Sequence, residues 1–177
     1  EFLQLISPSL PVGAFSYSEG LEWLVQNKKV YDEITLFNWI ECELSRGQIT
    51  IEASSIDLIM RDLVRWRDHK NVKYKLVVEE WNSWLSSLRD SPEVRSQQIQ
   101  MGESLLQLLI DLEHPLPDHE KKFIWPIAWA WAGVCWDIPK IDLVEGFLYG
   151  WVANQLSAAL RLLSLGPTKA QQLQKKS

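Results

Sequence analysis

The sequence predicts an all-α protein, folded as a single-domain helical bundle. Apolar residues recur at helical spacing along most of the chain, and no stretch alternates apolar and polar residues between turn signals. The length of 177 residues suits one domain with a sizeable core. We therefore expect one domain over residues 1–177, with about seven to ten helices and an N-terminal loop rich in Pro and Gly.

Residues 1–17 are predicted to form that extended N-terminal loop. Pro8, Pro11 and Gly13 interrupt any regular helix there. The first helix is expected to follow, with Ser18 as its N-cap, and to reach the polar residues 26–29.

The next helix is predicted to begin at a strong capping position. Asp32 or Thr35 supplies the cap, and the apolar residues that follow share one helical face until Gly47 ends the helix. A further helix with an apolar stripe covers residues 51–69. The β-branched residues at 48–51 are too few to predict a strand.

Capping and proline positions also delimit the following helices. One is expected over residues 72–89, and another starts with Ser91 as its cap and Pro92 as its first helical residue. Prolines at 115 and 117 then impose a loop.

Two helices are predicted in the last third of the chain. The apolar residues 123–136 form the first, with Pro126 tolerated in its opening turn. The second spans residues 140–164 and stops at Gly166 and Pro167. Residues 167–177 are polar and are expected to be a flexible tail.

Charge and composition exclude several classes of function. The net charge of −5 argues against a nucleic-acid binder, and the apolar run at 123–136 is too short to cross a membrane. The N-terminus does not resemble a signal peptide, and Cys42 and Cys135 form no disulfide framework. A cytoplasmic location is therefore expected. The basic residues at 61–70 are interrupted by Asp62 and Asp68, which indicates a solvated helix face.

Ten Trp residues stand out in the composition. Six fall on stripes that should be buried: Trp39, Trp66, Trp81, Trp84, Trp129 and Trp151. Trp125, Trp131 and Trp136 make the helix at 123–136 apolar nearly all the way round, which indicates an interface with a second subunit.

A stripe of small side chains lies on the last long helix. Its members are Gly146, Gly150, Ala153 and Ser157. Each interior glycine costs roughly 1 kcal/mol of helix propensity relative to Ala, so we expect another helix to approach closely. Both a neighbour within the bundle and a helix of a second copy remain open.

No catalytic or metal-binding motif is evident. The sequence has no CxxC, HxxxH, phosphate-binding loop or GxSxG pattern, and we predict neither catalytic residues nor a metal site. Two alternatives stay open: a metal site on the loop that carries His114 and His119, or an all-helical enzyme with a Trp-lined active site.

Three segments together resemble the urease accessory protein UreF family. The first is Ser7 to Glu22 (SPSLPVGAFSYSEGLE), and the second is Arg95 followed by Met101 to Leu106 (MGESLL). The third is Gly150 to Gly166 (GWVANQLSAALRLLSLG). After Gly166 the chain departs from the family's usual polar, Gly-containing continuation.

The resemblance implies an all-α accessory protein that is not an enzyme and has no cofactor of its own. Members of the family tend to form homodimers and bind UreD, also called UreH. That complex recruits the GTPase UreG and apo-urease, so that nickel delivery is coupled to GTP hydrolysis. Neither a membrane nor a nucleic acid is implied as a partner. In the context of this family, the metal alternative left open above becomes a direct nickel carrier that uses His114 and His119.

We assign the partner-binding surface, as a hypothesis, to residues within or next to the matched segments. These are Ser16, Tyr17, Ser18, Glu19, Gly20, Glu22, Arg95, Arg161, Gly166 and Lys169. For Ser18 the alternative is a helix cap, and for Arg161 it is an intramolecular clamp.

Overall fold

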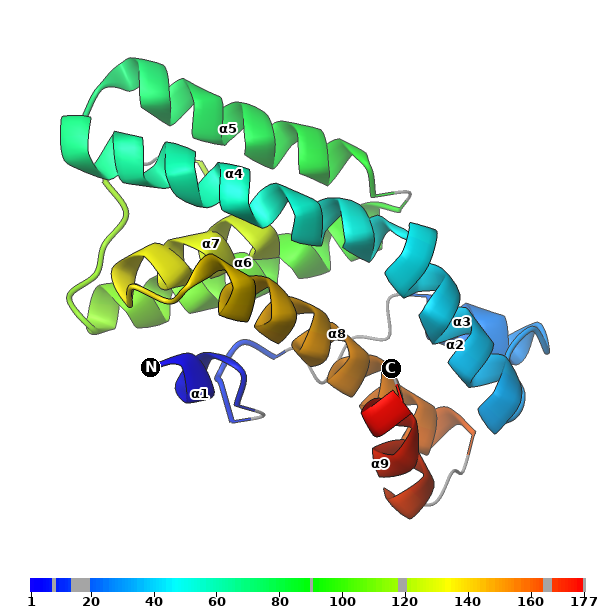
Figure 1. Cartoon of the computed structure of the whole chain (residues 1–177). Coiled ribbons are helices and arrows are strands. Elements are labelled where there is room, and N and C mark those ends of the chain that lie inside the picture. Colours follow the sequence, from blue (N-terminus) through cyan, green and yellow to red (C-terminus); the bar gives the residue numbers. More distant parts are fainter. Residues whose placement is uncertain (8, 14–19, 90, 118–120, 164–166, 177) are drawn as a thin grey trace. The chain divides into compact units, whose positions relative to one another are not determined.

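The computed structural model describes residues 1–7, 9–13, 20–89, 91–117, 121–163 and 167–176 (Figure 1). Every regular element in these ranges is a helix, which confirms the all-α prediction. The helices are α1 (Phe2–Leu5), α2 (Leu21–Gln26), α3 (Glu33–Arg46), α4 (Gln48–His69), α5 (Val72–Ser87), α6 (Pro92–Asp111), α7 (Trp125–Cys135), α8 (Lys140–Leu162) and α9 (Pro167–Lys176).

The chain divides into two compact units. Unit 1 comprises residues 1–12 and 52–147, and unit 2 comprises residues 13–51 and 148–177. Helices α4 and α8 each contribute residues to both units.

Unit 1 is built around two helix pairs. Helices α4 and α5 run side by side in opposite directions, and α6 packs against α7 (Figure 1). Its interior includes Ile56, Ile59, Leu63, Leu85, Leu105, Leu109 and Ile127. Trp129 also lies in this interior, where its indole N–H donates to the carbonyl oxygen of Leu143 at 3.0 Å.

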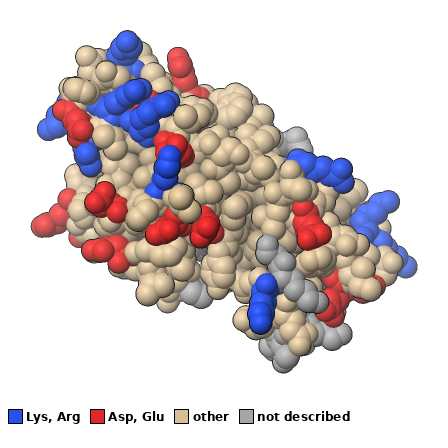
Figure 2. Space-filling view, viewed as in Figure 1, with Lys and Arg blue, Asp and Glu red and all other residues tan. Residues whose placement is uncertain are grey.

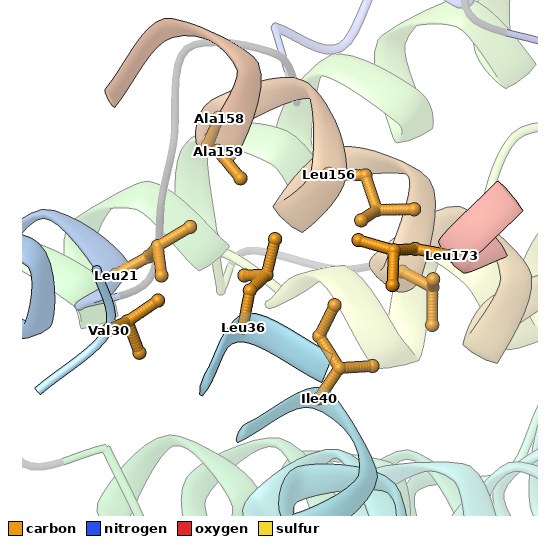
Figure 3. Packing of buried hydrophobic residues seen from close by; sticks show 9 residues of the cluster. Leu21, Val30, Leu36, Ile40, Leu156, Ala158, Ala159 and Leu173 are labelled. Carbon is orange, nitrogen blue, oxygen red and sulfur yellow. The ribbon is translucent and has the colours of Figure 1, made fainter. Parts of the chain in front are cut away.

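Unit 2 has its own apolar core. Figure 3 shows the buried cluster, which consists of Leu21, Val30, Leu36, Ile40, Val152, Leu156, Ala158, Ala159 and Leu173. These residues come from α2, the turn after it, α3, α8 and α9. Trp39 and Trp151 pack at the edge of this cluster, with their ring centroids 5.8 Å apart.

Three predicted helix ends are confirmed. Asp32 caps α3 and Thr35 completes a capping box, because each side chain bonds the other's backbone amide. Gly47 is the C-cap of α3. Ser91 caps α6 and accepts from the amide of Val94, with the neighbouring proline in the first turn.

The first predicted helix begins later than expected. Helix α2 starts at Leu21, and its N-cap is Gly20 with φ at 96°, a conformation that favours glycine. Ser18, the predicted cap, lies outside the described residues. Helix α4 begins at Gln48, three residues ahead of the predicted start at 51, and so includes the β-branched run.

Both predicted non-helical termini contain helix. Helix α1 lies within the predicted extended loop, where Leu5 is buried, and α9 occupies residues predicted to be a flexible tail. Leu173 of α9 is buried in the unit 2 core. Burial of that single apolar side chain stabilises the helix, although the polar composition of residues 167–177 does not by itself favour one.

The prediction that all six stripe Trp residues are buried is wrong for Trp84. Trp66 and Trp129 are buried, whereas Trp39, Trp81 and Trp151 are partly buried. Trp84 is exposed on α5, because the apolar residues of this helix extend beyond the face that unit 1 covers.

Candidate partner-binding site

The predicted partner-binding residues are only partly within the described structure. Ser16, Tyr17, Ser18, Glu19 and Gly166 lie outside the described residues. Lys169 belongs to α9. Gly20 and Glu22 are exposed at the start of α2, where Glu22 is the acidic residue of the first turn.

The residues after Glu22 place large apolar side chains in solvent. Trp23 is 60% exposed, Tyr31 63% and Ile34 70%. Trp and Tyr are the residue types most enriched at the energetic centres of protein interfaces. The segment from α2 to the first turn of α3 therefore has the composition of a binding surface, with an acidic residue at its edge.

Backbone hydrogen bonds hold this segment in a fixed shape. The carbonyl oxygen of Leu24 accepts from the amides of Lys29 and Val30 at 2.8 and 3.2 Å, closing the turn after α2. The amide of Tyr31 then donates to the hydroxyl of Thr35 at 3.0 Å. The exposed side chains are thus carried on an ordered backbone, which lowers the entropy lost on binding.

Buried residues of the same segment belong to the unit 2 core and anchor the segment there. Leu21, Val30 and Leu36 point toward one another in Figure 3, and each is almost completely buried. Because Leu21, Val30 and Leu36 fill the core, the side chains of Trp23 and Ile34 lie on the solvent-exposed face of the same segment. Helical and turn spacing places the two sets on opposite faces.

Arg95 and Arg161 have separate surroundings. Arg95 is exposed, yet its Nη2 donates to the carbonyl oxygen of Arg89 at 3.2 Å and so ties α6 to the end of α5. Arg161 is the basic residue in the last turn of α8, where it interacts favourably with the helix dipole. Arg95 lies in unit 1 and Arg161 in unit 2.

The three Trp residues assigned to a subunit interface differ in exposure. Trp131 is buried, and its indole N–H donates to the carbonyl oxygen of His114 at 3.0 Å. Trp125 and Trp136 are partly exposed, and the ring of Trp125 lies 5.3 Å from that of Trp129. Only Trp125 and Trp136 therefore retain surface for a second copy.

The small-residue stripe on α8 is covered at one end. A Cβ on Gly146 would lie 2.8 Å from the ring of Phe2 and 3.0 Å from Ile6, so α1 makes the close approach there. A Cβ on Gly150 would meet nothing within 4 Å, and Ala153 and Ser157 are partly exposed. An intramolecular neighbour accounts for Gly146 and leaves the other three positions accessible.

Residues in the middle matched segment have a role that the sequence analysis did not assign. A Cβ on Gly102 would overlap the carbonyl oxygen of Phe123 and lie 2.7 Å from the carbonyl carbon of Ile124. Glu103 Oε1 accepts from the amide of Phe123 at 3.1 Å, and Asn82 Oδ1 accepts from the amide of Ile124 at 2.9 Å. These contacts hold the residues that lead into α7 against both α5 and α6.

Buried polar residues were also missed. Glu52 and Arg89 form an ion pair inside unit 1, and Gln98 and Gln155 are buried on α6 and α8. Glu52, Gln98 and Gln155 occupy core positions within otherwise apolar helical stripes, a signal that could have identified their burial. Arg89 follows the end of α5 and carries no such signal.

Three carboxyl groups have lowered pKa values, and each shift arises from a contact that stabilises the fold. Hydrogen bonds from the backbone and side chain of Thr35 lower the pKa of Asp32, and those from its own backbone and Ser91 lower that of Glu93. Asp68 has its pKa lowered mainly by a hydrogen bond from Arg67. Helix capping and a surface ion pair therefore account for these shifts.

The described residues provide little that would support the two alternative functions. They contain no group of three or more His, Cys, Asp or Glu side chains able to hold a metal ion, and His119 lies outside them. A polar groove of about 450 Å³ beside α6 includes Glu103, the carboxylate that binds the amide of Phe123. None of the described helices is long and apolar enough to cross a membrane.

Comparison with known proteins identifies similar chains. The UreF family model matches residues 30–177. The urease accessory protein UreF of Prochlorococcus marinus (strain MIT 9301) is 43% identical over 173 residues, which cover 97% of this chain and 76% of that protein. The protein of the same name from Synechocystis is 38% identical over 188 residues, covering 98% and 77%. That from Microcystis aeruginosa is 37% identical over 171 residues, covering 97% and 74%.

The fold and these matches define an all-α protein whose relatives are named urease accessory proteins. The chain belongs to the UreF family. The resemblance predicted from the three matched segments is confirmed.

Proposed function

We propose that this chain is a urease accessory protein that binds UreD, also called UreH, and recruits and regulates the GTPase UreG, so that nickel is inserted into apo-urease. The observation that carries the proposal is the 43% identity to a urease accessory protein UreF over 97% of the chain. An accessory role needs a binding surface, and it does not need a catalytic constellation.

The partner-binding surface is assigned to the segment from Gly20 to Ile34. Its support is the exposure of Trp23, Tyr31 and Ile34 on an ordered backbone beside the carboxylate of Glu22. Aromatic anchors surrounded by charged groups are the usual composition of a protein interface.

Nickel and GTP belong to the complex in this proposal, and the chain itself has no cofactor and acts in the cytoplasm. A homodimer is proposed through the accessible part of Trp125 and Trp136 and through Gly150, Ala153 and Ser157. The support is their partial exposure together with the open space around Gly150.

The decisive experiment is co-purification of the chain with UreD and UreG, followed by measurement of GTP hydrolysis and urease activation. We expect a stable complex and a changed rate of GTP hydrolysis. Failure to co-purify with either protein would exclude the proposed function.

Two variants locate the surface. Ile34→Ala and Glu22→Arg should weaken the complex and lower urease activation. Ile34→Ala should leave the melting temperature unchanged because its side chain is exposed, whereas Glu22→Arg should lower it slightly because it reverses a favourable charge in the first turn of α2. Ile141→Ala is the matched control, since Ile141 is 65% exposed in unit 1. Equal effects of Ile34→Ala and Ile141→Ala would remove the assignment to this segment.

A further inference from the structure

The end of α4 and the start of α5 form a basic surface in an acidic chain. Residues 61–75 carry six Lys or Arg and two Asp, a net charge of +4, whereas the whole chain carries −5. Figure 2 shows Lys and Arg side chains gathered at the end of unit 1 where these two helices meet. We call residues 61–76 the basic end.

One of the two Asp residues of the basic end is turned inward. The carboxylate of Asp62 is nearly buried and accepts from Arg65 Nη1 and from the indole N–H of Trp81, both at 3.1 Å. It therefore joins α4 to α5, and the side chain of Arg65 remains about half exposed. The surface at this point presents positive charge.

The turn that joins the two helices is ordered. Lys70 adopts a φ of 47°, and its amide donates to the carbonyl oxygen of Trp66 at 2.9 Å, ending α4. Asn71 then caps α5 by accepting from the amide of Lys73 at 2.9 Å. Lys70 and Lys73 are thus exposed on a backbone that needs little reorganisation on binding.

Apolar side chains lie among these charges. Val72 is 68% exposed and Leu76 52%, and the two are one helical turn apart on α5. Glu80 and Trp84 continue from Leu76 at the same spacing, and both are exposed. Exposed aliphatic and aromatic side chains are unfavourable in water, and apolar patches with charged residues at their rim are typical of interaction sites. This row is therefore better explained by a binding surface than by a purely solvated helix face.

We propose that the basic end binds an acidic, amphipathic segment of a partner protein. Carboxylates of the partner meet Lys70 and Lys73, and its apolar side chains cover Val72 and Leu76. Opposite charge across the contact speeds association and sets its orientation, and the aliphatic pair supplies apolar area. This inference goes beyond the proposed function, which assigns partner binding to the segment from Gly20 to Ile34.

The arrangement of charges in the basic end disfavours two other anionic ligands, nucleic acids and anionic membranes. Arg61, Arg65 and Arg67 each lie within 4 Å of an Asp carboxylate, at 3.9, 3.1 and 2.8 Å, which reduces their value as phosphate contacts. Glu80 lies in the row between Leu76 and Trp84, where a carboxylate would repel an anionic membrane. A protein segment can end before Glu80 and still cover Val72 and Leu76, whereas a membrane surface would also meet that carboxylate.

The test uses the full chain and a fluorescein-labelled amphipathic peptide of Leu and Glu, measured by fluorescence anisotropy. We expect this peptide to bind more tightly than a scrambled peptide of the same composition. The double variant Lys70→Glu, Lys73→Glu should bind about tenfold more weakly, since both charges at the contact are reversed. Leu76→Ser should weaken binding without changing the net charge.

Lys122→Glu, Lys140→Glu is the matched control. It makes the same change in net charge, and both lysines are exposed in unit 1 outside the basic end and outside the segment from Gly20 to Ile34. Equal weakening by both double variants would overturn the proposal, as would equal binding of the scrambled peptide. Tighter binding of duplex DNA or of phosphatidylserine vesicles, lost in the Lys70→Glu, Lys73→Glu variant, would assign the surface to those ligands instead.

Discussion

Glu52 on α4 and Arg89 just after α5 form an ion pair in the interior of unit 1, and both side chains are almost completely buried. The carbonyl oxygen of Arg89 in turn accepts from Nη2 of Arg95 on α6. These polar contacts join α4, α6 and the residues that follow α5. Removing the side chain of either Glu52 or Arg89 would leave the other as an unpaired charge inside unit 1.

Replacing one member of this ion pair should be strongly destabilising. We expect Glu52→Leu or Arg89→Met to lower the free energy of unfolding by about 3–5 kcal/mol, because a buried charge loses its partner. The double variant should lose less than the sum of the two, since it leaves neither charge behind. Urea unfolding followed by circular dichroism measures all three, and additive losses would contradict a coupled pair.

Two helix glycines should respond to alanine in opposite directions. Gly102→Ala is expected to cost about 1–3 kcal/mol, because its Cβ meets the backbone of residues 123–124, which is anchored by Asn82 and Glu103. Gly150→Ala should gain about 0.5–1 kcal/mol, since its Cβ meets nothing and alanine favours helix. Thermal unfolding compares them. A loss at Gly150 that grows with protein concentration would show that a second copy covers this position.

The cap at Asp32 should make stability depend on pH in the acid range. Its pKa in the folded chain is lowered from the ordinary value of 3.8, chiefly by the backbone hydrogen bond from Thr35. The carboxylate therefore stabilises the fold fully above the unfolded pKa, and this contribution is lost as the pH falls through the lowered folded pKa. Asp32→Ala should lower the melting temperature at neutral pH, and the deficit should shrink below pH 3.8.

Asn71→Ala is the control for that experiment. Asn71 also caps a helix with its side-chain oxygen but does not titrate in this range. Its deficit in melting temperature should stay constant over the same pH range. A parallel decline in both variants would mean that the acid effect does not arise at Asp32.

Cys135 should resist alkylation in the folded protein. Burial raises the pKa of its thiol to about 12, and Arg67 offsets this only partly. Because the thiolate is the reactive form, roughly one molecule in ten thousand is reactive at pH 8. Iodoacetamide labelling followed by mass spectrometry should show slow modification of Cys135, with rapid modification after unfolding in urea. Cys135 is partly buried, and rapid labelling of the folded chain would contradict the raised pKa of its thiol.

Local signals predicted most of the helices. The residues that begin or end a helix contact only residues within one helical turn, so their effects can be predicted from sequence alone; these are Asp32, Gly47, Ser91 and Pro92. The buried ion pair is different, because Glu52 and Arg89 are 37 residues apart and only packing brings them together. Of the candidate site, Glu22 was assigned from its place in a matched segment, but the exposure of Trp23, Tyr31 and Ile34 depends on which residues the core covers.

The sequence by itself determined the all-α class, the principal helix boundaries and the family, because periodicity, capping and matched segments are properties of neighbouring residues. Only the tertiary structure decided that α9 forms around the burial of Leu173, that Gly146 is covered by α1 whereas Gly150 is open, and that Trp84 and Leu76 remain exposed. Each of these outcomes depends on contacts between residues distant in the chain, and the free energy of such contacts overrides local propensity.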